Sequence, residues 1–246
     1  MSTTMNPVVV ENLHVSFRGN RVLTGVDLEL RRGSATALVG ANAAGKSTLL
    51  RVLIGTLAPD AGGVRVLGLD PLEQGARVRA RIGYVADRLQ LPNWMRARDW
   101  LRFVSRLYPT WSRAEERRLC DLLGFDASAG VRELSKGSRA KLALVTALAH
   151  APALLLLDEP FSGLDVDTRR LSAKLAVEFL REEGRSVLLV SHSIGDIELV
   201  CDRVAVLAEG RIRQHDELER FAAAPRGGID LEAALCRAQS HKESAA

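Results

Sequence analysis

A glycine-containing segment that ends in a lysine and a serine offers the most specific chemistry in this sequence. It reads Gly40-Ala41-Asn42-Ala43-Ala44-Gly45-Lys46-Ser47 and lies between a strand-like and a helix-like apolar run. Glycines let the chain curl so that successive backbone N–H groups face phosphate oxygens, and the N-terminus of the following helix adds positive charge. The lysine can reach the β- and γ-phosphates, and the serine hydroxyl can bind Mg²⁺. The segment therefore predicts a nucleotide site made by Gly40, Asn42, Ala43, Ala44, Gly45, Lys46, Ser47 and Thr48, rather than a connection that binds nothing.

Two consecutive carboxylates end another apolar run, Leu154 to Leu157. Sheets that bind phosphate place a metal-coordinating acid at such a strand end. Asp158 suits Mg²⁺, directly or through water, together with the hydroxyl of Ser47. Glu159 then has the place to orient or deprotonate an attacking water. A strand cap in solvent is the alternative for this pair, but the phosphate-binding segment upstream favours the metal and base roles.

The composition is that of an ordinary globular protein. The 246 residues are 47% hydrophobic and 26% charged, enough for one large α/β domain or a core with a subdomain. The net charge of +4 comes from scattered arginines, which is typical of a solvated face rather than of a nucleic-acid patch. No apolar run reaches the roughly 18 to 20 residues of a membrane span and no signal-peptide layout is present, so we expect a cytoplasmic protein. The spacing of Cys120, Cys201 and Cys236 predicts neither a disulfide framework nor a zinc site.

Apolar patterning predicts the elements that must position these groups. Short strand-like runs fill the first third, and helical spacing among many charges from 92 to 149 indicates an inserted helical subdomain. Uninterrupted apolar runs at 153–157 and 186–190 are typical of parallel strands covered on both faces. The predicted strands are 8–10, 22–30, 35–39, 64–67, 82–85, 153–157, 186–190, 203–208 and 211–214, and helices are also predicted at 48–54, 167–183 and 229–237.

Three short motifs complete the pattern: Leu134-Ser135-Lys136-Gly137-Ser138, Ser162-Gly163-Leu164-Asp165 and Ser191-His192. In this order, and with the two motifs above, they resemble the nucleotide-binding subunit of an ABC transporter, from Phe17 to about Gln214. The resemblance implies an α/β fold: a P-loop NTPase core with a mixed sheet, an N-terminal antiparallel β subdomain and an inserted helical subdomain. It implies a core of residues 1–87 and 152–215, a helical subdomain of residues 88–151 with the Ser135 motif, and a C-terminal tail of residues 216–246.

The resemblance also implies roles at the matching positions. Lys46, Glu159 and His192 would be catalytic, with His192 as the sensor of the γ-phosphate. Phe17 would stack on adenine, although an aromatic residue there also suits the core.

Contacts across a dimer are implied for a further group of residues. Ser135 and Gly137 would touch the γ-phosphate bound by a partner subunit, and Asp165 would lie in a loop that crosses the interface. Two ATP molecules would then be sandwiched in a head-to-tail dimer. From the residues alone, Ser135 can equally be the N-cap of a helix that starts near Arg139, and the segment 162–165 can be a simple turn before a helix.

The sequence departs from the family pattern inside the nucleotide site. Ala43 stands where glycine is common, so the backbone there either occupies an allowed region or is strained by about 1 kcal/mol or more. Asp87 follows the predicted strand 82–85, where the family usually has a glutamine that touches Mg²⁺ and the attacking water. We expect Asp87 to be a metal ligand. Gln90, three residues later, is the alternative.

The Ser135 motif departs as well, because Lys136 and Ser138 replace a glycine and a glutamine. Together with Asp87, this variant resembles bacterial subunits that serve export-type permeases.

The leading prediction is an ATPase subunit that closes as a dimer on two ATP with Mg²⁺ and drives transport through separate membrane-spanning permease subunits. It pairs with itself or with a related ATPase subunit, it lies peripherally on the inner face of the cell membrane, and no nucleic-acid partner is expected. Leu91, Trp94 and Met95 lie where the subunit would couple to the permease, but the pattern assigns Trp94 to the core. The alternatives are a soluble ABC-type ATPase acting on nucleic acid or ribosomes, and a non-hydrolysing, nucleotide-gated regulatory subunit.

Overall fold

The computed structural model describes residues 5–87 and 90–222. An antiparallel sheet forms first, from β1 (Val8–Phe17), β2 (Asn20–Leu30) and β4 (Ala61–Val66), in the order β2-β1-β4. Val8 of β1 faces Leu30 of β2 on one side and Val66 of β4 on the other. All three side chains are buried, so one face of this sheet packs on the core.

The second sheet is mixed and has the strand order β5-β6-β7-β3-β8-β9. Its strands are parallel except β9, which runs antiparallel to β8. Every residue of β3, β6 and β7 is buried, which explains their uninterrupted apolar sequences. The two sheets confirm the predicted α/β fold class. The strands are β3 (Ala35–Val39), β5 (Ile82–Val85), β6 (Leu154–Asp158), β7 (Ser186–Val190), β8 (Arg203–Ala208) and β9 (Arg211–Glu217).

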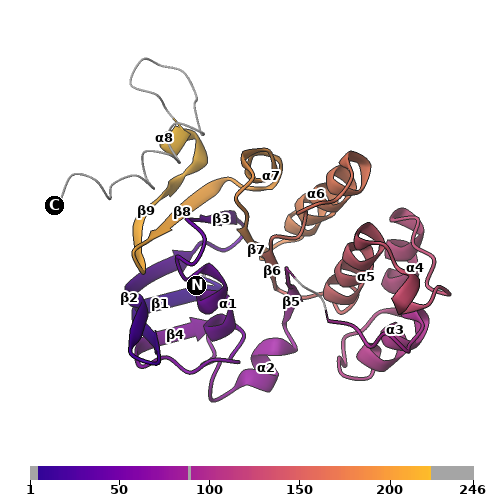
Figure 1. Ribbon diagram of the computed structural model, residues 1–246, viewed down its shortest axis with the longest axis horizontal. Coiled ribbons are helices and arrows are strands. Elements are labelled where there is room, and N and C mark those ends of the chain that lie inside the picture. The colour runs from indigo at the N-terminus through magenta and orange to yellow at the C-terminus, as the bar shows by residue number, and fades with distance from the viewer. Residues whose placement is uncertain (1–4, 88–89, 223–246) are drawn as a thin grey trace.

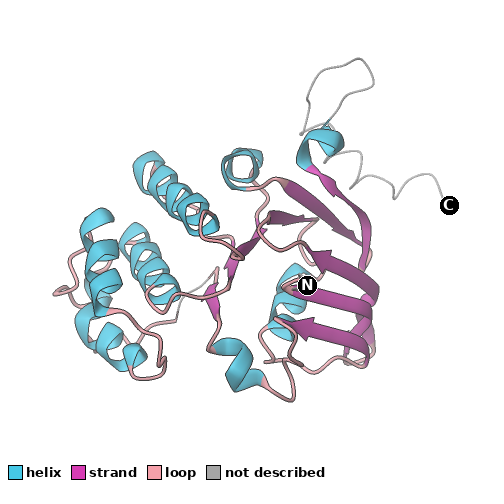
Figure 2. Ribbon diagram, turned by 180° about the vertical axis from the view of Figure 1, so that it is seen from behind, coloured by secondary structure: helices cyan, strands magenta, loops and turns pink. Residues whose placement is uncertain are grey.

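The helices between β5 and β7 gather on one side of the molecule, away from the antiparallel sheet (Figure 1; Figure 2). Between β5 and β6 lie α3 (Ala97–Ser105), α4 (Arg113–Leu122), a 3-10 helix (Val131–Glu133) and α5 (Lys136–Leu148). The remaining helices are α1 (Lys46–Leu53), α2 (Gly75–Arg79), α6 (Val166–Leu180), α7 (Ile194–Val200) and α8 (Leu218–Ala222). Within the described ranges, no helix is both long enough and apolar enough to cross a membrane.

Close backbone packing holds α5 against β5. A β-carbon at Gly83 would lie 2.4 Å from the carbonyl oxygen of Ala147, so a glycine is needed for this approach. Just after α5, the buried His150 places Nε2 3.1 Å from the Ile82 carbonyl and stacks on Tyr108 with 4.0 Å between ring centroids. Helices α3, α4 and α5 fall within residues 88–151, and the predicted division of the chain into subdomains stays a prediction.

Several local predictions need correction. Trp94 is 81% exposed, so its assignment to the core is wrong. It lies in a turn before α3, where Leu91 and Met95 face the core instead. Helix α5 starts at Lys136 and not near Arg139, because Ser135 caps it directly. The predicted helix 229–237 and Cys236 lie outside the described residues.

Two cysteines fall within the described residues. Cys120 and the buried Cys201 are free thiols. Burial is the main cause that raises the pKa of Cys120 to about 11, and it raises the pKa of Cys201 as well.

Candidate functional site

The loop between β3 and α1 has a backbone that only small residues allow. Gly45 has a φ of 106°, and a β-carbon there would lie 2.6 Å from Cδ2 of Leu23. A β-carbon at Gly40 would lie 2.2 Å from the carbonyl oxygen of Leu207. Ala43 has a φ of 64°, in the left-handed region. Of the two backbone conformations predicted for this residue, it adopts the strained one, at a cost of about 1 kcal/mol. The loop thus curls over the start of α1, as phosphate binding requires.

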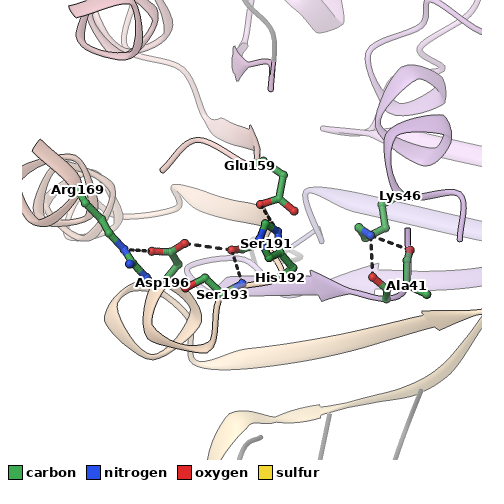
Figure 3. A network of polar contacts seen from close by, with 9 residues as sticks. Ala41, Lys46, Glu159, Arg169, Ser191, His192, Ser193 and Asp196 are labelled. Atoms are coloured by element: carbon green, nitrogen blue, oxygen red, sulfur yellow. Dashed lines mark hydrogen bonds and ion pairs between the residues drawn. The ribbon is translucent and has the colours of Figure 1, made fainter. Parts of the chain in front are cut away.

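The ammonium of Lys46 lies over this loop. Its Nζ donates to the carbonyl oxygens of Gly40, at 2.7 Å, and Ala41, at 3.0 Å (Figure 3). Burial lowers the pKa of Lys46, while the charges of Glu159 and Asp158 act in the opposite direction. The lysine is therefore a partly desolvated cation that faces two carboxylates.

The carboxylate of Asp158 ends β6 and is buried, with the residue 6% exposed. Burial raises its pKa, the charges of Asp87 and Glu159 raise it further, and a hydrogen bond with the Ser47 side chain opposes this shift. Tyr84, half-buried beside Asp158, has a pKa raised to about 12, mainly by burial. The charges around Asp158 therefore favour the binding of a cation.

The predicted metal ligands Ser47, Asp87 and Asp158 thus come together in the structure. In the described part of the chain, no group of three His, Cys, Asp or Glu side chains is arranged to hold a metal ion. The predicted set needs the serine hydroxyl as its third member. It consists of oxygen donors alone, which is the donor set that Mg²⁺ prefers, and its excess of carboxylates fits a divalent cation.

Glu159 and His192 form a contact at the ends of neighbouring strands. The N–H of Glu159 donates to the carbonyl of Val190 at 2.9 Å, and its Oε2 lies 2.9 Å from Nδ1 of His192 (Figure 3). Glu159 has a φ of 49°, a strained conformation of the kind found at functional sites. The side chain of His192 is 71% exposed, so its ring presents a free edge to solvent.

A cleft of about 420 Å³ brings together the phosphate-binding loop with Lys46 and the carboxylates of Asp87, Asp158 and Glu159. Phe17, 40% exposed, lies at this cleft and not in the core. Asp87 lines the cleft, whereas Gln90 does not. Three other residues predicted for the site, Gly40, Ala44 and His192, do not line the cleft. The lining residues are Phe17, Val22, Asn42, Ala43, Gly45, Lys46, Ser47, Thr48, Asp87, Asp158, Glu159 and Val190.

Ser135, Gly137 and Asp165 do not line this cleft. Ser135 is the N-cap of α5 and accepts a hydrogen bond from the N–H of Ser138 at 3.1 Å. Asp165 caps α6 in the same way, through the N–H of Thr168 at 2.9 Å, and hydrogen bonds with Thr168 lower the pKa of Asp165. A β-carbon at Gly137 would lie 3.7 Å from Oδ2 of Asp165, so the two motifs share one surface.

Two features of the site are not predicted by the sequence pattern. Val22 lines the cleft from β2, and nothing in its apolar strand pattern distinguishes it from a core residue. Asp196 and Arg169 bind each other below the turn of His192. No local spacing in the sequence signals this pair, because 27 residues separate Arg169 from Asp196.

Comparisons with known proteins identify the family of this chain. The ABC transporter family model matches residues 23–162, more than half of the chain. The chain is 36% identical over 202 residues to the Nod factor export ATP-binding protein I of Neorhizobium galegae, with 80% of this chain and 58% of that protein covered. It is 37% identical over 216 residues to the sulfate/thiosulfate import ATP-binding protein CysA of Bradyrhizobium diazoefficiens, with 84% and 62% covered. The chain thus spans less than two thirds of the length of these two relatives.

A solved structure described as the ATP binding subunit of an ABC transporter matches the fold with a TM-score of 0.84 at 27% identity, covering 94% of this chain and 98% of that chain. The chain therefore belongs to the ABC transporter family and has the fold of that family's ATPase subunits.

Proposed function

We propose that the chain is the ATP-hydrolysing subunit of an ABC transporter. The cleft is the observation that carries this proposal, because a single cavity of about 420 Å³ gathers the lysine, the hydroxyl and the carboxylates that phosphoryl transfer needs. Its size suits a nucleotide. Phe17, exposed at the cleft, offers its ring to the adenine base.

Mg²⁺ would be held by Ser47, Asp158 and Asp87. When bound, the ion supplies positive charge against the phosphate oxygens and helps to orient the γ-phosphate. The raised pKa of Asp158 supports this assignment, because it reflects burial and carboxylate repulsion that a cation would relieve.

Glu159 is the proposed general base. Its carboxylate would take the proton of the water that attacks the γ-phosphorus. His192, 2.9 Å away, would hold that carboxylate in place and contact the γ-phosphate with its exposed edge. Lys46 would stabilise the negative charge on the β- and γ-phosphates.

A second subunit completes the site in this proposal. The exposed Ser135 and its neighbour Gly137 lie outside the chain's own cleft, at the N-terminus of the 13-residue helix α5. We infer that they contact the γ-phosphate held by a second copy of the chain, or by a related subunit, in a head-to-tail dimer. Asp165 would then lie in the interface, because it shares their surface.

Membrane-spanning permease subunits are the proposed partners, with the chain peripheral on the cytoplasmic side of the membrane. The exposed Trp94, in a turn anchored by Leu91 and Met95, offers an apolar contact for them. We propose residues 88–151 as the helical subdomain that carries this surface. The matched relatives are named for export and for import, so the proposal concerns energy coupling and no direction of transport.

The substitution Glu159→Gln tests the proposed function. It keeps the shape of the side chain and removes the carboxylate that takes the proton. We expect ATP binding to persist, a Mg-ATP dimer to accumulate in size-exclusion chromatography, and turnover to fall by about 10² to 10³. The matched control is Glu198→Gln, at an exposed glutamate outside the cleft, which should turn over normally. Normal turnover in Glu159→Gln would remove the base assignment, and no ATP hydrolysis by the unchanged chain would remove the proposed function.

A further inference from the structure

A ring of polar contacts encloses the turn that carries His192 (Figure 3). Nε of Arg169 donates to Oδ1 of Asp196, and Oδ2 of Asp196 accepts from the hydroxyl of Ser191 at 3.2 Å. The same Ser191 oxygen accepts from the N–H of Ser193 at 3.1 Å. The Ser193 oxygen closes the ring by accepting from a terminal nitrogen of Arg169 at 2.6 Å. His192 is the residue between the two serines.

The local structure is adapted to this ring. Asp196 is 4% exposed, and a buried carboxylate needs a cationic or hydrogen-bonding partner. Ser193 occupies the N-cap position of α7, yet its side chain makes no cap bond because Arg169 engages it. A β-carbon at Gly195 would lie 3.3 Å from the guanidinium of Arg169, so the glycine leaves room for that side chain.

Arg169 lies in the first turn of α6, directly after the segment 159–165. Its N–H donates to the carbonyl of Asp165 at 2.9 Å in the first turn of α6. The segment from Glu159 to Asp165 thus leads directly into α6, and Arg169 of this helix binds the turn that carries His192. Arg169 connects the surface proposed for the second subunit to the histidine beside the proposed base.

We infer that Arg169 is a positioning residue for ATP hydrolysis, which acts by holding His192 against Glu159. This inference rests on the proposed function. Arg169 is not among the lining residues of the cleft, so its effect must pass through the ring. A misplacement of about 1 Å at a reacting group can lower a rate by about 10².

The test is Arg169→Met, which keeps the aliphatic stem and removes every donor. We expect kcat to fall by about 10- to 100-fold with KM for ATP within about twofold. Adding Arg169→Met to His192→Ala should cause no further loss, because Arg169 acts through the histidine that His192→Ala already removes. Arg169→Lys should restore part of kcat. The control Arg170→Met, at the exposed neighbouring residue, should behave as the unchanged chain does.

A second variant controls for loss of folding, because Arg169→Met leaves the buried Asp196 without its cation. Arg169→Met with Asp196→Asn removes that charge and should show the same kcat loss. A loss that adds to that of His192→Ala, or an unchanged kcat in a folded variant, would overturn the inference.

Hydrogen exchange of the nucleotide-free chain supplies a readout that does not depend on ATP hydrolysis. We expect the Ser193 amide to exchange at least about tenfold faster in Arg169→Met, with the amides of β6 unchanged. Unchanged exchange at residues 191–197 would also overturn the inference. An unchanged chain that hydrolyses no ATP would instead remove the proposed function, while the exchange would still decide whether Arg169 holds the turn.

Discussion

At the scale of the residue, the charge balance of the cleft predicts a requirement for a divalent cation. Asp87, Asp158 and Glu159 line one cleft, where burial raises the pKa of Asp158 and the charges of Asp87 and Glu159 raise it further. A neutral glutamine at position 87 would not repel the phosphates of an ATP that lacks a metal ion. The carboxylate of Asp87 repels the γ-phosphate. We therefore expect a site that closes on ATP only when a divalent cation is present.

The substitution Asp87→Gln tests this requirement. Removing one repulsive contact of about 1–2 kcal/mol should strengthen ATP binding in EDTA by about tenfold and shrink the ratio of affinities with and without Mg²⁺. Calorimetry under both conditions measures the ratio. Gln90→Ala, at the rival position outside the cleft lining, should leave it unchanged. An unchanged ratio in Asp87→Gln would place this residue outside the metal shell.

At the scale of the element, α5 begins with a serine that fits two roles. Ser135 caps the helix, so Ser135→Ala should lower stability by about 1 kcal/mol, or Tm by roughly 2–4 °C. Ser135→Asp keeps a good cap and suits the helix dipole, so its Tm should stay close to that of the unchanged chain. Its charge would nevertheless repel a phosphate, and ATPase activity should fall about 10²-fold. Normal activity in Ser135→Asp would leave Ser135 as an N-cap alone.

The predictability of these elements follows from burial. Strands β3, β6 and β7 are covered on both faces, so their apolar runs locate them within a residue or so. Trp94 was wrongly assigned to the core because helical spacing does not tell whether a turn faces inward. The ring of Arg169 was invisible, since its partner Asp196 lies 27 residues away and only tertiary structure brings them together.

The same limits apply to the site. Local backbone chemistry made the loop at Gly40 to Ser47 recognisable, and the structure gathers the predicted Lys46, Asp158 and Glu159 around one cleft. The conformation of Ala43 stayed open in the sequence, because an alanine is compatible with two backbone regions and only the fold selects the positive φ.

At the scale of the whole molecule, the placement of the Ser135 motif predicts complementation between two inactive chains. Lys46→Ala and Ser135→Asp should each abolish most ATPase activity in a homodimer. When the two variants are mixed, one site of each mixed dimer combines an intact Lys46 with an intact Ser135. Random pairing then restores roughly a quarter of the activity of the unchanged chain. A mixture no more active than its components would contradict the head-to-tail homodimer.

In the proposed dimer, the separation between Ser135 and the cleft also predicts the kinetic order of the reaction. In the proposed dimer each turnover begins with an encounter of two chains, so the rate per chain rises with chain concentration until pairing saturates. Two subunits bound to one permease meet at a high effective concentration, and their encounter becomes intramolecular. A dilute, unattached subunit would therefore hydrolyse little ATP, because its own cleft lacks the Ser135 motif that a second subunit would supply.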